Sequence, residues 1–232
     1  MSRTRVSRDE AITVAQAWLR REHEPDYGAP LGVIGDSIEE SEDAFGIPWQ
    51  AQAFLDGDEK EEIIGTFPLI VDKRSGELMF GRALIALDIQ LREDAPAGAH
   101  RRTHPPPVNS SACAKAVDAR MTGERRAFAG SMTAGVPLKT IEREWGGPLD
   151  PKPWAEIQDE LIQAGDGARG VMTLHAPGAA HIVNLVNDRG TIRINDGFIG
   201  KTATSLSDYL DVTGFQNPPA MVRFRLTYSD LQ

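Results

Sequence analysis

Residues 181–196 read HIVNLVNDRGTIRIND. Two runs of β-branched and aliphatic residues flank a polar segment at 187–190, a pattern typical of antiparallel strands joined by a tight turn. If Asp188 and Arg189 form the tip, His181 lies directly opposite Asp196, with Cβ atoms about 4.5–5.5 Å apart. The carboxylate could then hold a ring N–H of His181 and fix its tautomer. A register slip of one residue would put the two side chains on opposite faces.

The rest of the C-terminal half predicts helices first and an antiparallel sheet afterwards. We expect a helix over 111–122 that stops at Gly123, and a second carrying Leu138, Ile141 and Trp145. Asp150 and Pro151 predict the N-cap and first turn of a third helix, which ends at Gly165. The expected strands cover 170–174, 181–186, 191–195 and 220–226, with a short helix over 205–210. This order indicates an α+β fold.

The N-terminal half predicts one helix followed by an antiparallel meander, which is again α+β. Ser7 and Glu10 have the spacing of a capping box, and apolar residues at helical intervals predict a helix over 8–22. Alternating residues predict strands over 49–55, 66–71 and 77–80. A proline-rich stretch that includes three consecutive prolines at 105–107 separates the halves. We therefore expect domains at 1–95 and 108–232, with a linker over 96–107.

Charge is unevenly divided along the chain. The 232 residues carry a formal net charge of −9. Residues 1–95 hold 10 basic and 20 acidic side chains, whereas residues 96–232 hold 15 and 14, so the N-terminal half carries the whole net charge. An acidic surface argues against a nucleic-acid partner for that half. It leaves open a contact with a basic partner, or with the other half of the same chain.

The sequence also limits compartment and cofactors. No apolar run approaches the length of about 18 residues that a membrane helix needs, and no apolar segment follows the basic N-terminus as in a secretory signal. We expect a protein that is cytoplasmic, or exported without a Sec-type signal, and that has no membrane partner. Cys113 is the single cysteine, which excludes an intramolecular disulfide and a multi-cysteine zinc site. No motif indicates a metal or another cofactor.

A histidine oriented by an aspartate needs a nucleophile, and the helix that follows the proline-rich stretch offers one. A helix N-terminus carries unsatisfied N–H groups and a partial positive charge, so it lowers a thiol pKa and can supply oxyanion donors. Ser110 and Cys113 lie at or near this terminus. The order along the chain is then nucleophile, helices, His181 on one strand and Asp196 on the next.

Residues 109–123 read NSSACAKAVDARMTG and resemble the opening of the papain-fold toxin family of bacterial polymorphic toxins. In that family the opening pattern is Asn-Cys-x-x-Cys on an apolar helix. The segments 181–186 and 195–197 resemble the family's histidine and aspartate strands. The resemblance covers about 109–201 and implies a papain-like cysteine hydrolase that deamidates glutamine, with Ser110, His181 and Asp196 as the catalytic positions.

The sequence departs from the family pattern at the nucleophile. The family's catalytic cysteine falls on Ser110, and Cys113 matches the second cysteine, which leaves Cys113 as an alternative nucleophile. Serine at 110 is either the natural residue of an inactive or altered protein, or a replacement for a natural cysteine. A hydroxyl must lose its proton during attack and is a much weaker nucleophile than a thiolate here. We expect the chain as written to be inactive or nearly so.

The N-terminal half resembles the small immunity-protein-35 (YrhB-like) family. The resemblance rests on the helix at 9–21, the segment 47–52 with Trp49, and the turn 66–78 with its Pro-hydrophobic-Val-Asp-x-x-x-Gly pattern. It implies a module that neutralises a toxin or recognises a substrate rather than a catalytic one.

Three functions are consistent with these observations. The first is deamidation of a glutamine side chain in a protein substrate, through a thioester at position 110 in the active form. Cleavage of a peptide bond is the same chemistry with a different leaving amine, so a cysteine protease of the same fold is the second. The third is a catalytically dead papain-like module that binds a protein partner in its cleft.

Overall fold

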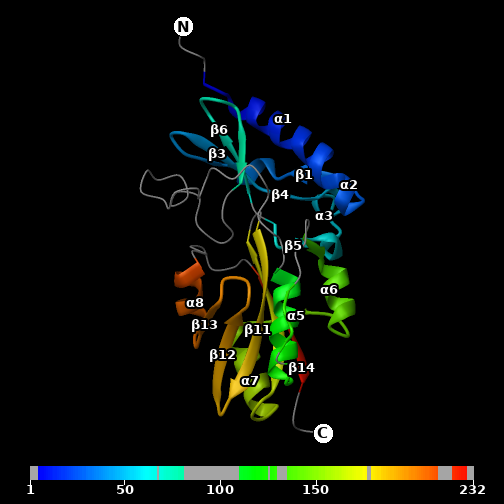
Figure 1. Ribbon diagram of the computed structural model, residues 1–232, viewed down its shortest axis with the longest axis vertical. Coiled ribbons are helices and arrows are strands. Elements are labelled where there is room, and N and C mark those ends of the chain that lie inside the picture. Colours follow the sequence, from blue (N-terminus) through cyan, green and yellow to red (C-terminus); the bar gives the residue numbers. More distant parts are fainter. Residues whose placement is uncertain are drawn as a thin grey trace.

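The computed structural model describes residues 5–66, 68–80, 110–124, 126–129, 135–176, 179–213 and 221–228. Its helices and antiparallel sheets confirm the α+β class in both halves. In Figure 1 the N-terminal half stands above the C-terminal half, whose largest sheet points its β11 strand towards the boundary. The expected linker at 96–107 lies outside the described residues, so the proposed domain limits rest on the sequence.

The N-terminal half packs a helical run against a small antiparallel sheet. Ser7 caps α1 (Arg8–Trp18) through the predicted capping box with Glu10. The run continues without a break through a π-helical segment (Leu19–His23) into α2 (Glu24–Tyr27), so it is longer than expected. The sheet has the order β2-β3-β6-β7, formed by Glu39–Glu40, Ala44–Ile47, Leu69–Asp72 and Leu78–Phe80. A separate pair joins β1 (Leu31–Val33) to β4 (Trp49–Ala51).

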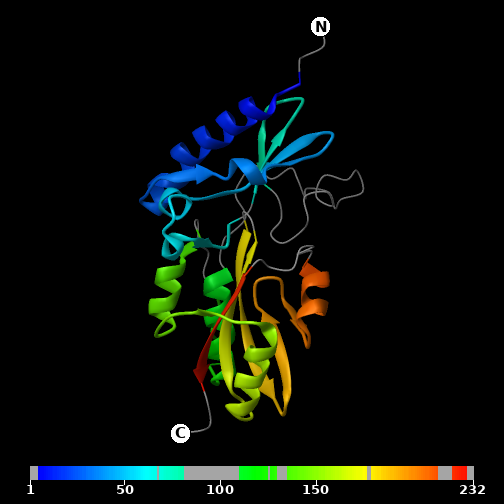
Figure 2. The same ribbon diagram turned by 180° about the vertical axis from the view of Figure 1, so that it is seen from behind.

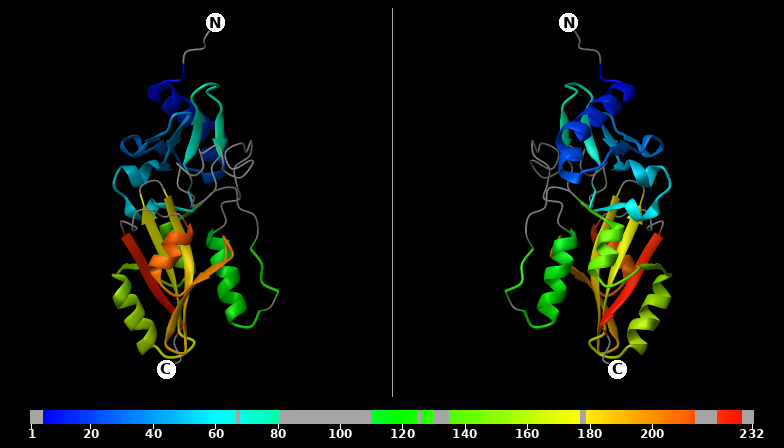
Figure 3. Two further views of the ribbon diagram at one scale, coloured as in Figure 1. Left: turned by 90° about the vertical axis from the view of Figure 1, so that its left-hand side faces the viewer. Right: turned by 90° about the vertical axis from the view of Figure 1, so that its right-hand side faces the viewer.

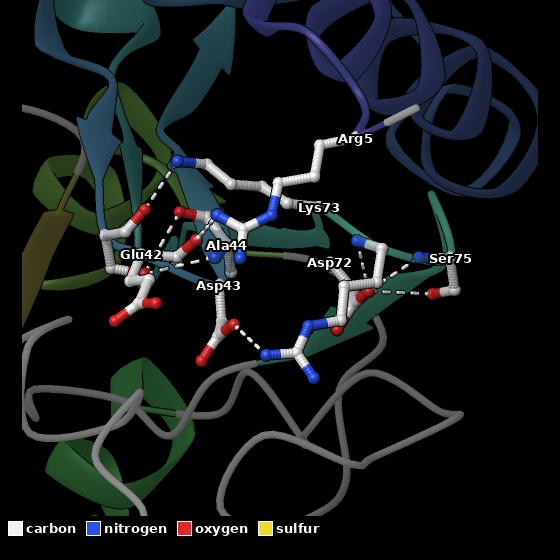
Figure 4. A network of polar contacts seen from close by, with 9 residues as sticks. Arg5, Glu42, Asp43, Ala44, Asp72, Lys73 and Ser75 are labelled. Atoms are coloured by element: carbon white, nitrogen blue, oxygen red, sulfur yellow. Dashed lines mark hydrogen bonds and ion pairs between the residues drawn. The ribbon is translucent and has the colours of Figure 1, made fainter. Parts of the chain in front are cut away.

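A network of polar contacts surrounds the turn after β6 (Figure 4). Asp72 accepts hydrogen bonds from the backbone N–H groups of Arg74 and Ser75 at 2.8 and 2.7 Å, and Gly76 follows with a positive φ of 72°. Lys73 is buried and reaches Glu40 at 2.5 Å while its ammonium lies 4.6 Å from the centre of the Phe45 ring. Asp72 and Gly76 therefore stabilise the turn itself, and no catalytic role is needed to explain them.

The prediction of a strand over 49–55 is wrong in its second part. Only Trp49–Ala51 is extended, and Gln52–Leu55 forms the short helix α3. Alternation over seven residues does not distinguish a strand from a strand followed by one helical turn. The next strand also begins later than expected, at Leu69 rather than Thr66, and two short elements follow α3, a 3₁₀ turn (Glu59–Glu61) and β5 (Ile63–Ile64).

The C-terminal half is built on one antiparallel sheet with the order β13-β12-β11-β10-β14-β9. The strands of this sheet are β9 (Asp150–Pro151), β10 (Arg169–Ala176), β11 (Ala179–Asp188), β12 (Thr191–Asp196), β13 (Lys201–Ala203) and β14 (Met221–Tyr228). The helices are α5 (Ser110–Met121), α6 (Leu138–Glu144), α7 (Trp154–Gln163) and α8 (Leu206–Thr213).

Helices cover both faces of this sheet, with α5 and α7 on opposite sides (Figures 2 and 3). Ile157 and Leu161 of α7 pack with alternate sheet residues that include Leu174, Val183 and Ile194. The other face packs Ala114 of α5 with Val171, Ala180 and Ile182. Alternate residues of β11 therefore belong to two different cores, which makes its register critical.

One helix of this half begins later than predicted, and one of its strands was not predicted. The third helix does not begin at Asp150–Pro151, because those residues form β9 beside β14 and the helix starts only at Trp154, after Pro153. Pro151 and Pro153 lack backbone N–H groups and favour the extended approach to the helix. The short strand β13 was not predicted, because three residues with one apolar side chain give little periodic signal.

The two halves are joined by residues 59–65, which we call the interface segment. β5 pairs with β8 (Val136–Pro137), and Gly65 N–H donates to the carbonyl of Ala180 at 2.6 Å. Four consecutive charged side chains of this segment pair with the C-terminal half: Glu59 with Arg223, Lys60 with Glu142, Glu61 with Lys139, and Glu62 with His175. Ile64 is 1% exposed and belongs to the core formed by α5, α6 and the sheet.

Truncation of Ile64 should therefore destabilise the C-terminal half, although the residue comes from the other half. We expect Ile64→Ala to lower the free energy of unfolding by about 2–4 kcal/mol, the cost of a cavity at a buried isoleucine. Ile162 is 48% exposed, so the matched change Ile162→Ala should cost no more than about 0.5 kcal/mol. Denaturant unfolding followed at the C-terminal tryptophans measures both, and equal effects would mean that Ile64 does not join the halves.

The N-terminal core contains a buried histidine between two indole rings. His23 is 5% exposed, stacks on Trp49 at 5.1 Å between ring centres and meets Trp18 edge-on at 4.8 Å. Burial lowers the pKa of His23, against the opposing charges of Asp26 and Glu22. The fold therefore favours the neutral ring.

This environment makes the stability of the N-terminal half depend on pH. The unfolded chain protonates His23 at a higher pH than the folded chain does, so stability falls as pH drops below about 6.5. His23→Phe keeps an aromatic ring but cannot be protonated. We expect this variant to lose less stability than the parent between pH 7.5 and 5.5, two values that bracket the ordinary histidine pKa of roughly 6.5. Thermal unfolding at the two pH values measures the difference, and parallel losses would contradict the assignment.

Candidate active site

The hairpin of β11 and β12 has a register that differs from the predicted one. Asp188 pairs with Thr191, so the tip is Arg189 and Gly190, both with positive φ of 53° and 86°. A two-residue turn of this kind needs positive φ at both positions, and glycine meets that need at the second. Asp196 therefore lies opposite Val183 rather than His181. The shift moves the pairing by one residue on each strand, which leaves His181 and Asp196 on the same face as diagonal neighbours.

His181 and Asp196 nevertheless form the expected pair. His181 Nε2 lies 2.7 Å from Asp196 Oδ2, and the two residues are 1% and 2% exposed. Since an ionised carboxylate can only accept, Nε2 carries the proton and Nδ1 of the neutral ring is a lone-pair acceptor. The ring of Phe198 lies 5.8 Å from that of His181. The arrangement fixes the tautomer that a general base at Nδ1 requires.

Asp196 is surrounded by donors. Its Oδ1 accepts the backbone N–H groups of Phe198 and Ile199 at 2.8 and 3.1 Å, and its Oδ2 accepts the hydroxyl of Tyr209 at 2.6 Å in addition to His181. Burial by itself would raise the pKa of Asp196, but the hydrogen bond and charge of His181, together with these other donors, outweigh burial and lower it below the ordinary value. The carboxylate is therefore ionised at neutral pH.

Helix α5 starts at the end of the sheet where this pair lies. Its last residue, Met121, contacts Asn195 of β12, while a Cβ placed on Gly197 would lie 2.6 Å from Val117 and 3.1 Å from the carbonyl of Cys113. The N-terminal end of α5 therefore extends beyond Asp196, towards the His181 end of β11. By alternation His181 faces the α7 core, whereas α5 covers the other face of the sheet.

Ser110 is the first residue of α5 and is 4% exposed. Its Oγ is buried and has no hydrogen-bond partner among the described residues. A buried hydroxyl without a partner costs free energy that a structural serine would normally avoid. No contact in the described part of the fold therefore explains why residue 110 is a serine.

The surroundings of Cys113 disfavour the thiolate that an alternative nucleophile would need. It lies one turn further into α5 and is 8% exposed. The helix terminus was expected to lower a thiol pKa, but burial and then the charge of Asp196 raise the pKa of Cys113. The thiol is therefore protonated at neutral pH and behaves as a small buried side chain.

A second histidine lies near this site but on the other face of the sheet. His175 Nδ1 lies 2.6 Å from Glu62 Oε2 of the interface segment, and its Nε2 lies 2.7 Å from Thr173 Oγ1. All three residues are buried. This histidine therefore connects the two halves.

A cavity of about 390 Å³ opens beside the other end of α5. Its lining includes Val117, Met121, Asn195, Asp196, Lys201 and Thr202. It adjoins the C-terminal half of α5, away from Ser110, so it is not the place where a substrate would meet position 110. No group of metal-binding side chains occurs in the described parts of the chain, and no described helix is long and apolar enough to cross a membrane.

Comparison with known families agrees with this arrangement. Residues 108–201 match a family described as papain fold toxin 1, glutamine deamidase, and residues 9–93 match immunity protein 35. The C-terminal half is thus similar to the papain-fold glutamine deamidase toxins. No curated protein matches the chain. The two resemblances seen in the sequence are thereby confirmed in the predicted order, and the deamidase match supports a toxin-like, hydrolase-type function for this half.

Tyr209 was missed by the sequence reasoning. It lies in α8, beyond the residues that match the deamidase family, and only its spacing with Leu206 and Leu210 on a short amphipathic helix singled out that segment. Such spacing is typical of core residues and carries no signal for a contact with Asp196.

Loss of the Asp196 charge should strongly destabilise the C-terminal half. Asp196→Asn leaves buried N–H and O–H donors without an ionised acceptor, and we expect a loss of about 2–4 kcal/mol in unfolding free energy at pH 7. Asp188 is a matched control, because its ion pairs with Arg189 and Arg193 involve partly exposed arginines, so Asp188→Asn should have only a small effect.

The stabilisation that Asp196 contributes should depend on pH in a defined direction. Because the pKa of Asp196 is lowered in the folded chain, its contribution is complete above the unfolded carboxyl pKa and is lost as pH falls through the folded value. The difference between parent and Asp196→Asn should be constant from neutral pH to about pH 5 and should shrink in more acid solution. Denaturant unfolding across this range measures it, and a difference that grows in acid would contradict an ionised Asp196.

Proposed function

We propose that the C-terminal half is the scaffold of a cysteine-dependent amide hydrolase that deamidates a glutamine side chain of a protein substrate, with position 110 as the nucleophile. The buried pair of His181 and Asp196, with Nδ1 left as the acceptor, is the observation that carries the proposal. Ser110 begins α5, and its Oγ has no hydrogen-bond partner among the described residues, so position 110 is the best candidate for the nucleophile. The family match supports the substrate class.

The reaction needs a thiol at position 110. The thiol gives its proton to His181 Nδ1 and its sulfur attacks the carboxamide carbon, while N–H groups at the start of α5 stabilise the oxyanion. The C–N bond breaks, and the amine takes the proton from His181 and leaves as ammonia. Water then gives a proton to His181 and attacks the thioester, which releases a glutamate side chain and restores the thiol. Asp196 orients His181 and stabilises its charged form throughout.

A serine at position 110 supports a second candidate, a papain-like module that binds a partner without turnover. The side chains of Ser110, His181 and Asp196 are 4%, 1% and 2% exposed, so a protein cannot reach them in the described conformation. Under the enzymatic proposal, the residues around this site must move apart before substrate binds. The chemistry of position 110 distinguishes the two candidates.

Ser110→Cys should restore hydrolase activity. Incubated with bacterial or host protein extracts, the variant should produce peptides that gain about 1 Da at glutamine, as expected when an acyl-enzyme is hydrolysed by water. The parent chain should be at least about 100-fold slower, because its hydroxyl lacks thiolate reactivity. Peptide mass spectrometry measures both, and new termini instead of the mass gain would indicate proteolysis.

Two further variants serve as controls for this experiment. His181→Ala in the Ser110→Cys background should abolish the gain, whereas Cys113→Ala in the same background should leave it unchanged. Activity that survives His181→Ala would sink the proposed mechanism. Activity that disappears with Cys113→Ala would transfer the nucleophile to Cys113.

A further inference from the structure

The hydroxyl of Tyr209 makes a side-chain hydrogen bond to Asp196, as the ring of His181 does. Tyr209 Oη donates to Asp196 Oδ2 at 2.6 Å, the same oxygen that accepts from His181 Nε2. Tyr209 is 0% exposed and belongs to the core that α7 and α8 form with the sheet. It is contributed by α8, outside residues 108–201, so the family match assigns it no role.

Oδ1 and Oδ2 of Asp196 are held in different ways. The backbone N–H groups of Phe198 and Ile199 hold Oδ1, and the turn that follows β12 fixes both donors. Only side chains hold Oδ2. Without Tyr209, His181 would be the one remaining hydrogen-bond donor to Asp196 Oδ2 among the described contacts. His181 is also the residue that Asp196 must orient, so it cannot by itself fix the rotation of the carboxylate about the Cβ–Cγ bond.

Tyr209 is suited to this task because it stays protonated and fixed. Burial, and then the charge of Asp196, raise the pKa of Tyr209 far above its ordinary value, so its hydroxyl is a donor at every working pH. Its helix is capped by Ser205 Oγ, which accepts from Asp208 N–H at 3.1 Å, and in the last turn Thr213 Oγ1 donates to the Tyr209 carbonyl at 3.0 Å.

We propose that Tyr209 is a positioning residue that, through its hydrogen bond to Oδ2, holds Asp196 in the rotamer that binds His181 Nε2–H. The inference rests on the proposed function where it concerns catalysis, but the positioning itself is a property of the chain as it stands. Tyr209 does not touch the reacting atoms in this proposal, and its effect on reaction at position 110 is transmitted through Asp196 and His181.

The positioning is tested in the unaltered chain by NMR. In Tyr209→Phe the His181 Nε2 proton should exchange with water about 10-fold faster or more, the factor that a hydrogen bond to a charged group represents. The Asp196 carboxyl carbon should also titrate at higher pH, because a donor that lowers the pKa of Asp196 is gone. Tyr27→Phe is the matched control, since Tyr27 also has a buried hydroxyl but lies in the N-terminal half, away from Asp196.

Each result of this test decides the inference. Faster exchange and a shifted Asp196 titration in Tyr209→Phe alone, with backbone amides of β11 unchanged, support positioning. Equal behaviour of Tyr209→Phe and Tyr27→Phe overturns it. Faster exchange of the β11 amides together with the His181 proton also overturns it, because Tyr209 would then be a general core residue.

Reactivity at position 110 links the inference to the proposed function. In a Ser110→Cys, Cys113→Ala background, alkylation by iodoacetamide should persist at pH 6, below the ordinary thiol pKa of about 8.5, because protonated His181 stabilises the thiolate. Adding Tyr209→Phe should slow the pH 6 rate about 10-fold or more, the factor expected for loss of one hydrogen bond to a charged group, and Tyr27→Phe should not. If His181→Ala leaves the alkylation profile of the background unchanged, the proposed function fails, and the NMR result still decides the role of Tyr209.

Discussion

A carboxylate buried among apolar side chains is the constraint on which the C-terminal half depends. Asp196 is 2% exposed and ionised, and an unpaired charge in such a place would cost more than the fold can supply. Four donors make it tolerable, and they come from a turn, from α8 and from β11. The end of β12, the start of the following loop and the position of α8 are thus tied to one side chain. The same ties leave His181 with one defined tautomer, so stability and chemistry rest on the same contacts.

The sequence was sufficient to find this pair but not its geometry. Alternation along 181–186 and 191–195, and the polar turn between them, predict the strands and put His181 and Asp196 on one face. The direct opposition was wrong because the turn uses Arg189 and Gly190, a choice set by the positive φ that glycine accepts. The face survived because a shift of one residue on each strand preserves the alternation. Local patterns thus decide which face a side chain occupies, whereas turn chemistry decides its partner.

Other features were out of reach for a different reason. The strand predicted over 49–55 ends at Ala51, and the helix predicted from Asp150 begins at Trp154, because neighbouring strands at β1 and β14 capture the preceding residues. Tyr209 and the interface segment make contacts with residues that are 13 or more positions away in the chain. Such contacts depend on how the helices and strands pack against one another, and the periodicity of the sequence does not predict them. Ser110, by contrast, was indicated both by its place at a predicted helix N-terminus and by the family resemblance.

The uneven charge has a more specific meaning once the halves are seen together. Of the acidic side chains of the N-terminal half, Glu59, Glu61 and Glu62 are already engaged by Arg223, Lys139 and His175 of the C-terminal half. They cannot attract a basic partner without first giving up these contacts. The segment that carries them also donates from Gly65 to Ala180, next to His181. The carbonyl of Ala180 that accepts this hydrogen bond belongs to β11, directly before His181. Since His175 lies opposite Ala180 in the sheet, the Glu62–His175 contact and the hydrogen bond from Gly65 hold the same end of β10 and β11 against the N-terminal half.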